Sequence, residues 1–176
     1  MYLWIGCKLP MEYETRLRQQ CLLLNEQLRL DTTAFMLPQH ISLKISFCTD
    51  QWADVLSYLE QYLSQQDPFA VEIQPPQQNG NILWLPVAEN TVLQQLHRQL
   101  DSQLEERFGI TQHEFDKCFL FHSTLFIDTD ADKLSRMYKA LLPLPIAGTM
   151  MVDTFLLGVS ETGTPGSYRV LREIRV

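Results

Sequence analysis

The feature that most constrains the fold is the segment of residues 39–47, in which polar and apolar side chains alternate. Side chains of a β-strand point alternately to opposite faces, so this pattern predicts a strand with one buried face. The predicted buried face carries Ile41, Leu43, Ile45 and Phe47. The opposite face carries His40, Ser42, Lys44 and Ser46. An imidazole and a hydroxyl two residues apart therefore point the same way from a strand anchored in the core.

The opening of this strand occurs a second time, 82 residues further along the chain. His40-Ile41-Ser42-Leu43 is matched in kind by His122-Ser123-Thr124-Leu125. Each copy is followed by Thr-Asp, then an amphipathic segment, then a Pro-apolar-Ala sequence that opens another strand. A repeat of this length indicates a duplicated structural unit. We expect two strand–helix–strand units whose histidine strands face each other across a cleft.

Hydrophobic periodicity predicts the remaining elements. Helices are expected over 11–30, from the Thr49-Asp50 cap to before residue 67, over 91–108, and from a cap at 128–130 to residue 141. Strands are expected over 2–9, 69–73, 82–87, 119–127 and 168–176, and residues 146–160 are expected to form one long strand or two short ones. Turn-forming residues at 75–81 predict that 69–73 and 82–87 pair as a hairpin.

The composition is that of an ordinary globular protein. The 176 residues are 45% hydrophobic, enough for one sizeable core, and they carry a net charge of −7. An acidic chain lacks the clustered basic surface that grips long nucleic acids, so we expect no extended nucleic-acid binding. Binding of a small or terminal phosphate is compatible with this charge.

Cysteines and apolar runs bear on the location of the protein. The four cysteines stand far apart with no paired metal spacing, and we expect them to be buried apolar residues in a reducing cytoplasm. The N-terminal residues do not resemble a signal peptide. The chain has no apolar run near the roughly 18 residues that cross a bilayer, so we expect no membrane association.

The two His-x-[Ser/Thr]-Leu sequences resemble the paired motifs of the 2H phosphoesterases, which include 2'-5' RNA ligases and 2',3'-cyclic phosphodiesterases. The strand Ile82-Leu83-Trp84-Leu85 and the ending from Phe155 to Leu171 extend the resemblance over essentially the whole chain. It implies an α+β fold of two pseudo-symmetric lobes, each an antiparallel sheet backed by helices, with a central cleft. We therefore expect a single bilobal domain over residues 1–176 and a monomer.

The resemblance and the chemistry of imidazole together indicate the catalytic residues. A histidine can act as general acid or general base because its unperturbed pKa, about 6.5, lies near working pH. We expect His40 and His122 to flank the phosphate as acid and base, and Ser42 and Thr124 to bind its oxygens. Which histidine is the acid stays open.

Other side chains are secondary candidates for contact with the substrate. Lys44 shares the face of His40 and is expected to approach the phosphate. Phe126 shares the face of His122 and is expected to stack on a base, with packing between the lobes as the alternative. Trp84 and Tyr168 are further stacking candidates, with burial in the core as the alternative. His97 and His113 are expected to be surface histidines.

No cofactor is expected. Two histidines with two hydroxyls make a poor metal site, and the chain has no HExxH or CxxC sequence. The expected activity is metal-independent hydrolysis of a 2',3'-cyclic phosphate or a related phosphodiester at a nucleotide or RNA end.

Three alternatives stay open from the sequence. The first is 2'-5' RNA ligation, which Ile127 disfavours because ligase members often carry arginine at that position. The second is a module that binds a nucleotide or RNA end without turnover. The third is a purely structural domain, in which the two histidines would not face each other.

Overall fold

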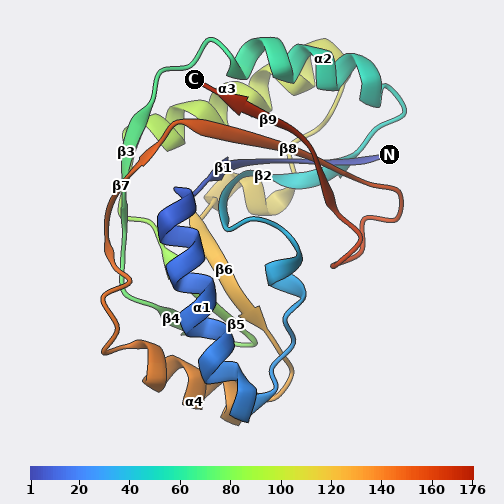
Figure 1. Ribbon diagram of the computed structural model, residues 1–176. Coiled ribbons are helices and arrows are strands. Elements are labelled where there is room, and N and C mark those ends of the chain that lie inside the picture. The colour runs from blue at the N-terminus through green and yellow to red at the C-terminus, as the bar shows by residue number, and fades with distance from the viewer.

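The computed structural model describes residues 1–176 and contains four α-helices and nine strands (Figure 1). The helices are α1 (Met11–Leu28), α2 (Trp52–Leu63), α3 (Thr91–Phe108) and α4 (Ala131–Leu141), with short 3₁₀ helices η1 (Thr33–Met36) and η2 (Glu114–Cys118). The strands are β1 (Tyr2–Lys8), β2 (His40–Cys48), β3 (Phe69–Ile73), β4 (Gln77–Asn79), β5 (Ile82–Pro86), β6 (His122–Ile127), β7 (Gly148–Val152), β8 (Thr154–Ser160) and β9 (Arg169–Arg175).

The strands form two lobes of antiparallel sheet. One lobe has the strand order β2-β1-β8-β9, and the other contains β4-β5-β6. The pair β3-β7 runs along the side of the molecule, and Ile73 of β3 forms an isolated bridge with Val87, the residue after β5. The two histidine strands, β2 and β6, belong to different lobes and contact each other. The expected α+β fold of two related lobes is confirmed.

Each lobe is covered by one helix from each half of the chain. Helices α2 and α3 lie together over the β2-β1-β8-β9 sheet, and α1 and α4 lie together on the other lobe (Figure 1). Tyr62 on α2 donates a hydrogen bond to Gln99 on α3 over 2.7 Å. On the other lobe, the Tyr13 hydroxyl of α1 donates to the Ile146 carbonyl over 2.8 Å. This exchange of helices ties the two halves of the sequence together.

Local sequence signals set the helix boundaries. Asn90 caps α3 by accepting a hydrogen bond from the Leu93 N–H, and Gly109 ends it in the left-handed conformation that glycine adopts without strain. Asp130 caps α4 through the Lys133 N–H. The expected Thr49-Asp50 cap of α2 is wrong, because Gln51 occupies the cap position without a side-chain bond.

The predicted hairpin of 69–73 with 82–87 is confirmed only at one end, where Ile73 bridges Val87, and the rest of the pairing is wrong. β3 pairs with β7, so that Phe69 lies opposite Val152, whereas β5 pairs with β4 and β6. The intervening turn residues instead form β4, which folds back on β5. Pairing with a strand almost 80 residues away in sequence is a tertiary choice that local turn signals do not report.

A bulge interrupts both histidine strands at the equivalent residue. In β2, Gly6 of β1 faces Ser42 and the next residue, Ile5, faces Lys44, which leaves Leu43 without a partner. In β6, Trp84 of β5 faces Thr124 and Leu83 faces Phe126, which leaves Leu125 without one. An extra residue in one strand reverses the inward and outward alternation of the residues that follow it.

One continuous core of 36 buried apolar residues extends through both lobes. Cys7 and Cys21 belong to it, and burial raises the pKa of the Cys21 thiol to about 12. The expectation of burial is wrong for Cys48 and Cys118, which are exposed. None of the helices combines the length and the apolar character that a bilayer span requires.

Candidate active site

The two motif histidines line the same cavity. His40 from β2 and His122 from β6 both contribute to a cavity of about 770 Å³ between the lobes. The strands are joined beside the histidines, since the buried Ser123 hydroxyl donates to the Gln39 side-chain oxygen over 2.9 Å. The structure therefore brings together the two imidazoles that the sequence placed in separate units.

Each imidazole is oriented by the same local hydrogen bond. Nδ1 of His40 lies 2.7 Å from the Pro38 carbonyl oxygen, and Nδ1 of His122 lies 2.6 Å from the Leu120 carbonyl oxygen. A carbonyl oxygen only accepts hydrogen bonds, so Nδ1 carries the proton in both neutral rings. Nε2 is then an unprotonated base in each, free of any hydrogen bond within the protein.

A tryptophan packs against each histidine ring. The ring centroids of Trp4 and His40 are 4.5 Å apart, and those of Trp84 and His122 are 4.3 Å apart. The two indoles come from positions that are not equivalent in the repeat, because Trp84 faces Thr124 whereas Gly6 takes the corresponding place opposite Ser42. Each lobe thus places an indole beside its histidine in its own way.

Burial lowers the pKa of both histidines. For His40 the dominant cause is desolvation, which outweighs the hydrogen bond to Pro38, and the nearby charge of His122 lowers the pKa further. For His122 the cause is again desolvation, partly offset by the Leu120 carbonyl. The neutral form of both rings is therefore favoured at neutral pH, and a negative charge in the cavity would favour protonation of either one.

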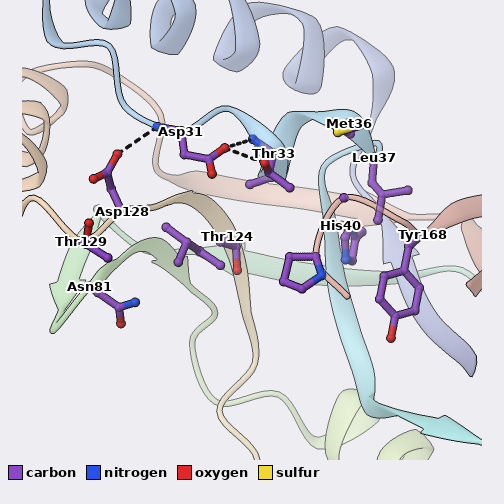
Figure 2. Close-up of a pocket in the computed structure, with 14 residues that line it drawn as sticks. Asp31, Thr33, Met36, Leu37, His40, Asn81, Thr124, Asp128, Thr129 and Tyr168 are labelled. Atoms are coloured by element: carbon purple, nitrogen blue, oxygen red, sulfur yellow. Dashed lines mark hydrogen bonds between the residues drawn. The ribbon is translucent and has the colours of Figure 1, made fainter. Parts of the chain in front are cut away.

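The two motif hydroxyls lie in adjoining cavities. Ser42 lines the 770 Å³ cavity with both histidines. Thr124 lines a neighbouring cavity of about 650 Å³, which also includes His40 (Figure 2). Leu37, His40 and Tyr168 belong to the walls of both cavities. The two cavities therefore form one cleft, with His40 at their junction and His122 on the wall of the first cavity.

The bulges remove two predicted residues from the histidine faces. Lys44 and Phe126 each lie four residues after a motif histidine and just beyond a bulge. Phe126 is 0% exposed and packs edge-on against Phe35, so it cannot stack on a base, and the prediction that it does is wrong. Ile127 takes the place on the cleft side and lines the second cavity.

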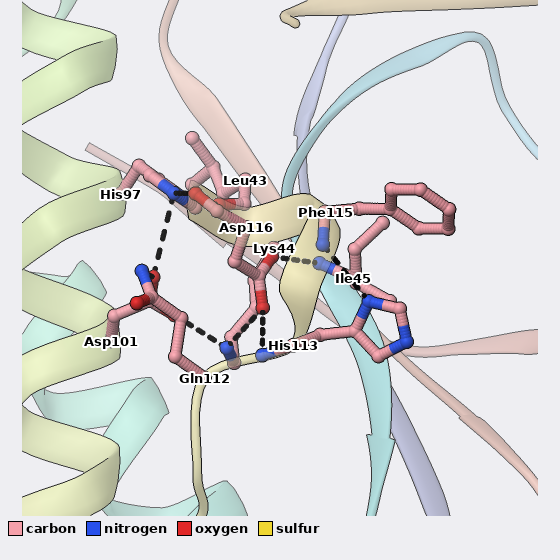
Figure 3. Close-up of polar contacts among 9 residues, drawn as sticks. All are labelled: Leu43, Lys44, Ile45, His97, Asp101, Gln112, His113, Phe115 and Asp116. Atoms are coloured by element: carbon pink, nitrogen blue, oxygen red, sulfur yellow. Dashed lines mark hydrogen bonds and ion pairs between the residues drawn. The ribbon is translucent and has the colours of Figure 1, made fainter. Parts of the chain in front are cut away.

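The ammonium group of Lys44 is bound by two buried carboxylates (Figure 3). Lys44 is 3% exposed, and its Nζ donates to Asp101 of α3 and, over 2.7 Å, to Asp116 of η2. Although Lys44 borders the first cavity, its positive charge is neutralised there. Its predicted role in phosphate binding is therefore not supported by its surroundings.

His97 belongs to the same cluster, and the expectation of a surface position is wrong. It is 6% exposed, its Nδ1 lies 2.7 Å from the Leu43 carbonyl oxygen, and its Nε2 lies 2.8 Å from the Asp116 carbonyl oxygen. These two contacts, together with the hydrogen bond from the Ile45 N–H to Asp116, pin the β2 bulge to η2. His113 is exposed, as expected.

This cluster also contains the group of side chains closest to a metal-binding arrangement. Ligand atoms of His97, Asp101 and Asp116 lie within 4.8 Å of one another. Lys44 already supplies the cation to both carboxylates, and both nitrogens of His97 face carbonyl oxygens. These residues therefore fit an internal ion-pair network and do not fit a metal site.

Comparison with known proteins identifies the family. A sequence model of the 2'-5' RNA ligase superfamily matches residues 16–164, which is most of the chain. The chain belongs to the 2'-5' RNA ligase superfamily. This superfamily comprises phosphoesterase and RNA ligase-like enzymes, and membership confirms the resemblance inferred from the paired motifs. Among curated proteins, no sequence matches the chain significantly.

Several solved structures share the fold. TT0787 of Thermus thermophilus aligns with a TM-score of 0.68 and 20% identity, over 99% of this chain and 97% of that one. LigT of E. coli, solved in complex with NADP+, aligns with a TM-score of 0.64 and 21% identity, over 99% and 96% of the two chains. LigT has also been solved with 3'-AMP and with ATP. Similarity at this identity establishes the architecture alone.

Sequence reasoning missed several residues that line the cleft of this superfamily member. Trp4 was assigned only to a strand, although it packs against His40. Phe115 and Leu120 are each 65% exposed and line the first cavity with Phe119. The phenylalanines at 115 and 119, which lie between α3 and the motif strand β6, were the sequence signal that could have indicated this part of the wall. Trp84 and Tyr168, which were considered, do line the cleft.

Gly6 provides a test of the contact between Trp4 and His40. A Cβ atom at Gly6 would lie 2.8 Å from the Trp4 ring and 3.0 Å from Cδ2 of His40. Gly6→Ala should destabilise the protein by about 1–3 kcal/mol through overpacking. It should also shift the His40 imidazole proton signals in the NMR spectrum. Adding Trp4→Leu should relieve the crowding, and wild-type stability with unshifted signals would contradict this packing.

Asp116 provides a test of the buried ion-pair cluster. Burial raises the pKa of its carboxyl, but hydrogen bonds from Lys44 and the Ile45 N–H outweigh burial and hold the pKa below its usual range. Asp116→Asn leaves Lys44 with one partner and should cost about 3 kcal/mol in urea unfolding at neutral pH.

The pH dependence of this cost follows from linkage. Because the folded-state pKa of Asp116 is depressed, its contribution is complete above the unfolded value of about 3.8 and is lost as pH falls through the folded value. The difference between Asp116→Asn and wild type should therefore be constant above about pH 4 and narrow as the pH falls below about 3.8. The exposed control Asp54→Asn should change stability by less than about 0.5 kcal/mol, and an equal effect of both variants would refute the cluster's role.

Proposed function

We propose that the protein is a metal-independent phosphoesterase that hydrolyses a 2',3'-cyclic phosphate or a related phosphodiester at a nucleotide or RNA end. The observation that carries this proposal is that His40 and His122 line one cavity while each commits Nδ1 to a backbone carbonyl. Hydrolysis of a phosphodiester requires one proton removed from water and one delivered to the leaving oxygen. Two imidazoles with free Nε2 atoms meet that requirement.

The resting protonation state suggests how the acid is generated. Both histidines are neutral in the free protein, so the catalytic pair must gain one proton when the anionic diester binds. The phosphate charge stabilises one imidazolium, which becomes the general acid, while the other imidazole stays a base. The base takes a proton from water as its oxygen bonds to phosphorus, and the acid protonates the oxygen whose P–O bond breaks.

The surrounding side chains suit a nucleotide. The Ser42 hydroxyl lies in the histidine cavity and can donate to a phosphoryl oxygen. Exposed Phe115 and the rings of Tyr168 and Trp84 line the same space and offer faces on which a base can stack. The LigT complexes with 3'-AMP, NADP+ and ATP support a nucleotide ligand for a protein of this fold.

Ligation of RNA ends is the second candidate, because the family model is that of the 2'-5' RNA ligase superfamily. In ligation a 5'-hydroxyl takes the place of water: one imidazole removes the hydroxyl proton as its oxygen bonds to phosphorus, and the other protonates the 3'-oxygen whose P–O bond breaks. An assay with a cyclic-phosphate end and a free 5'-hydroxyl end measures whether the phosphate is transferred to water or to the hydroxyl.

The test is turnover of a panel of cyclic and linear phosphodiesters in the presence of EDTA. Removal of either imidazole should lower kcat by about 10² to 10⁴, so His40→Ala and His122→Ala should be nearly inactive. His113→Asn is the matched control, because His113 is exposed outside the cleft, and it should retain normal turnover.

Near-normal turnover by either alanine variant would refute the paired-histidine mechanism. Loss of activity in EDTA, restored by a divalent cation, would refute metal independence. Tight nucleotide binding without turnover at any pH would instead indicate a binding module.

A further inference from the structure

The second cavity, which is lined by Thr124 and His40, differs in its polar groups from the cavity that holds both histidines. Its volume is about 650 Å³, and it continues from the histidine cavity past His40 and Tyr168 (Figure 2). Thr124 and Ile127, both from β6, contribute to its wall. A ligand whose phosphorus lies between the histidines can therefore extend one substituent into each cavity.

The charged side chains of the second cavity are acidic. Asp31 and Asp128 line it, and its 14 lining residues include no lysine or arginine. Hydrogen bonds from the backbone N–H groups of Asp130 and Asp31 hold the pKa of Asp128 below its usual range, so this carboxylate is ionised. The lysine that borders the neighbouring cavity, Lys44, is neutralised by two carboxylates. The cleft therefore offers one end that repels anions.

The free polar atoms of this cavity suit a neutral ligand rich in hydrogen-bond donors. Oδ1 of Asp31 accepts from the N–H and the hydroxyl of Thr33, which leaves Oδ2 free. Asn81 and Thr129 add amide and hydroxyl groups to the wall. Sugar hydroxyls and the amino groups of bases are donors of the matching kind.

We propose that the second cavity binds an uncharged nucleoside attached to the far side of the scissile phosphate, and that it rejects a nucleoside bearing a terminal phosphate. This inference rests on the proposed function and refines its substrate to a two-sided diester. A terminal phosphomonoester carries about −1.5 to −2 charges at neutral pH. Placed beside Asp31 and Asp128, that charge meets repulsion, and no lysine or arginine lines the cavity to offset it.

The test compares three dinucleosides joined by an uncleavable methylenephosphonate link. One has no terminal phosphate, one has a 5'-phosphate, and one has a 3'-phosphate. Binding is followed by tryptophan fluorescence, because Trp4 and Trp84 line the first cavity. We expect one of the two terminal phosphates to weaken binding about tenfold at low salt, and high salt to reduce that difference.

The variant Asp31→Asn separates the effect of the negative charge of Asp31 from that of its hydrogen bonds. Both hydrogen bonds that Asp31 accepts go to Oδ1, so asparagine can keep them while losing the negative charge. This variant should recover affinity for the disfavoured dinucleoside by at least about threefold, and Asp54→Asn on α2 should recover none.

Three outcomes would overturn the inference. Equal binding of all three dinucleosides would remove the second subsite and leave the proposed phosphoesterase standing. Equal effects of Asp31→Asn and Asp54→Asn would do the same. Failure of every dinucleoside to bind would also remove the subsite, whereas the proposed function stands or falls separately by the turnover of cyclic phosphates.

Discussion

The arrangement of the cleft depends on one hydrogen bond made twice, from the Nδ1–H of a histidine to the carbonyl two residues before it. His40 makes this bond to Pro38, and His122 makes it to Leu120. The bond sets the tautomer and turns Nε2 toward the cavity, while an indole packs against each ring. Because the histidine and the carbonyl are only two residues apart, the short segment that precedes each strand is enough to orient its imidazole. The strand pairing then only has to bring the two segments together.

The bulge in each histidine strand determines which later side chains of that strand face the cleft. Beyond each bulge, the residue four positions after the histidine turns to the interior, where Lys44 enters an ionic cluster and Phe126 enters the apolar core. The cluster joins β2, α3 and η2, and η2 carries Phe115 on the wall of the cleft. The charge of Lys44 is thus used to hold the wall of the cleft.

The sequence predicted the parts of the structure that local patterns encode. The repeated His-x-[Ser/Thr]-Leu sequence led to two lobes and a shared cleft, because duplicated strands pair in duplicated ways. Strict alternation failed at Lys44 and Phe126, since a bulge depends on the partner strand and leaves no mark in the strand's own sequence. His97 and the pairing of β3 with β7 were missed for the same reason. Their partners are backbone groups distant in sequence.

The most direct test of this account is the ¹⁵N NMR spectrum of the histidine side chains, recorded as pH is lowered and again with a bound phosphodiester. The account predicts that His40 and His122 are neutral Nδ1–H tautomers at neutral pH, with pKa values below the ordinary 6.5. It also predicts that bound diester raises the pKa of one of them. Nε2–H tautomers, or titration of both rings unchanged by the diester, would contradict it.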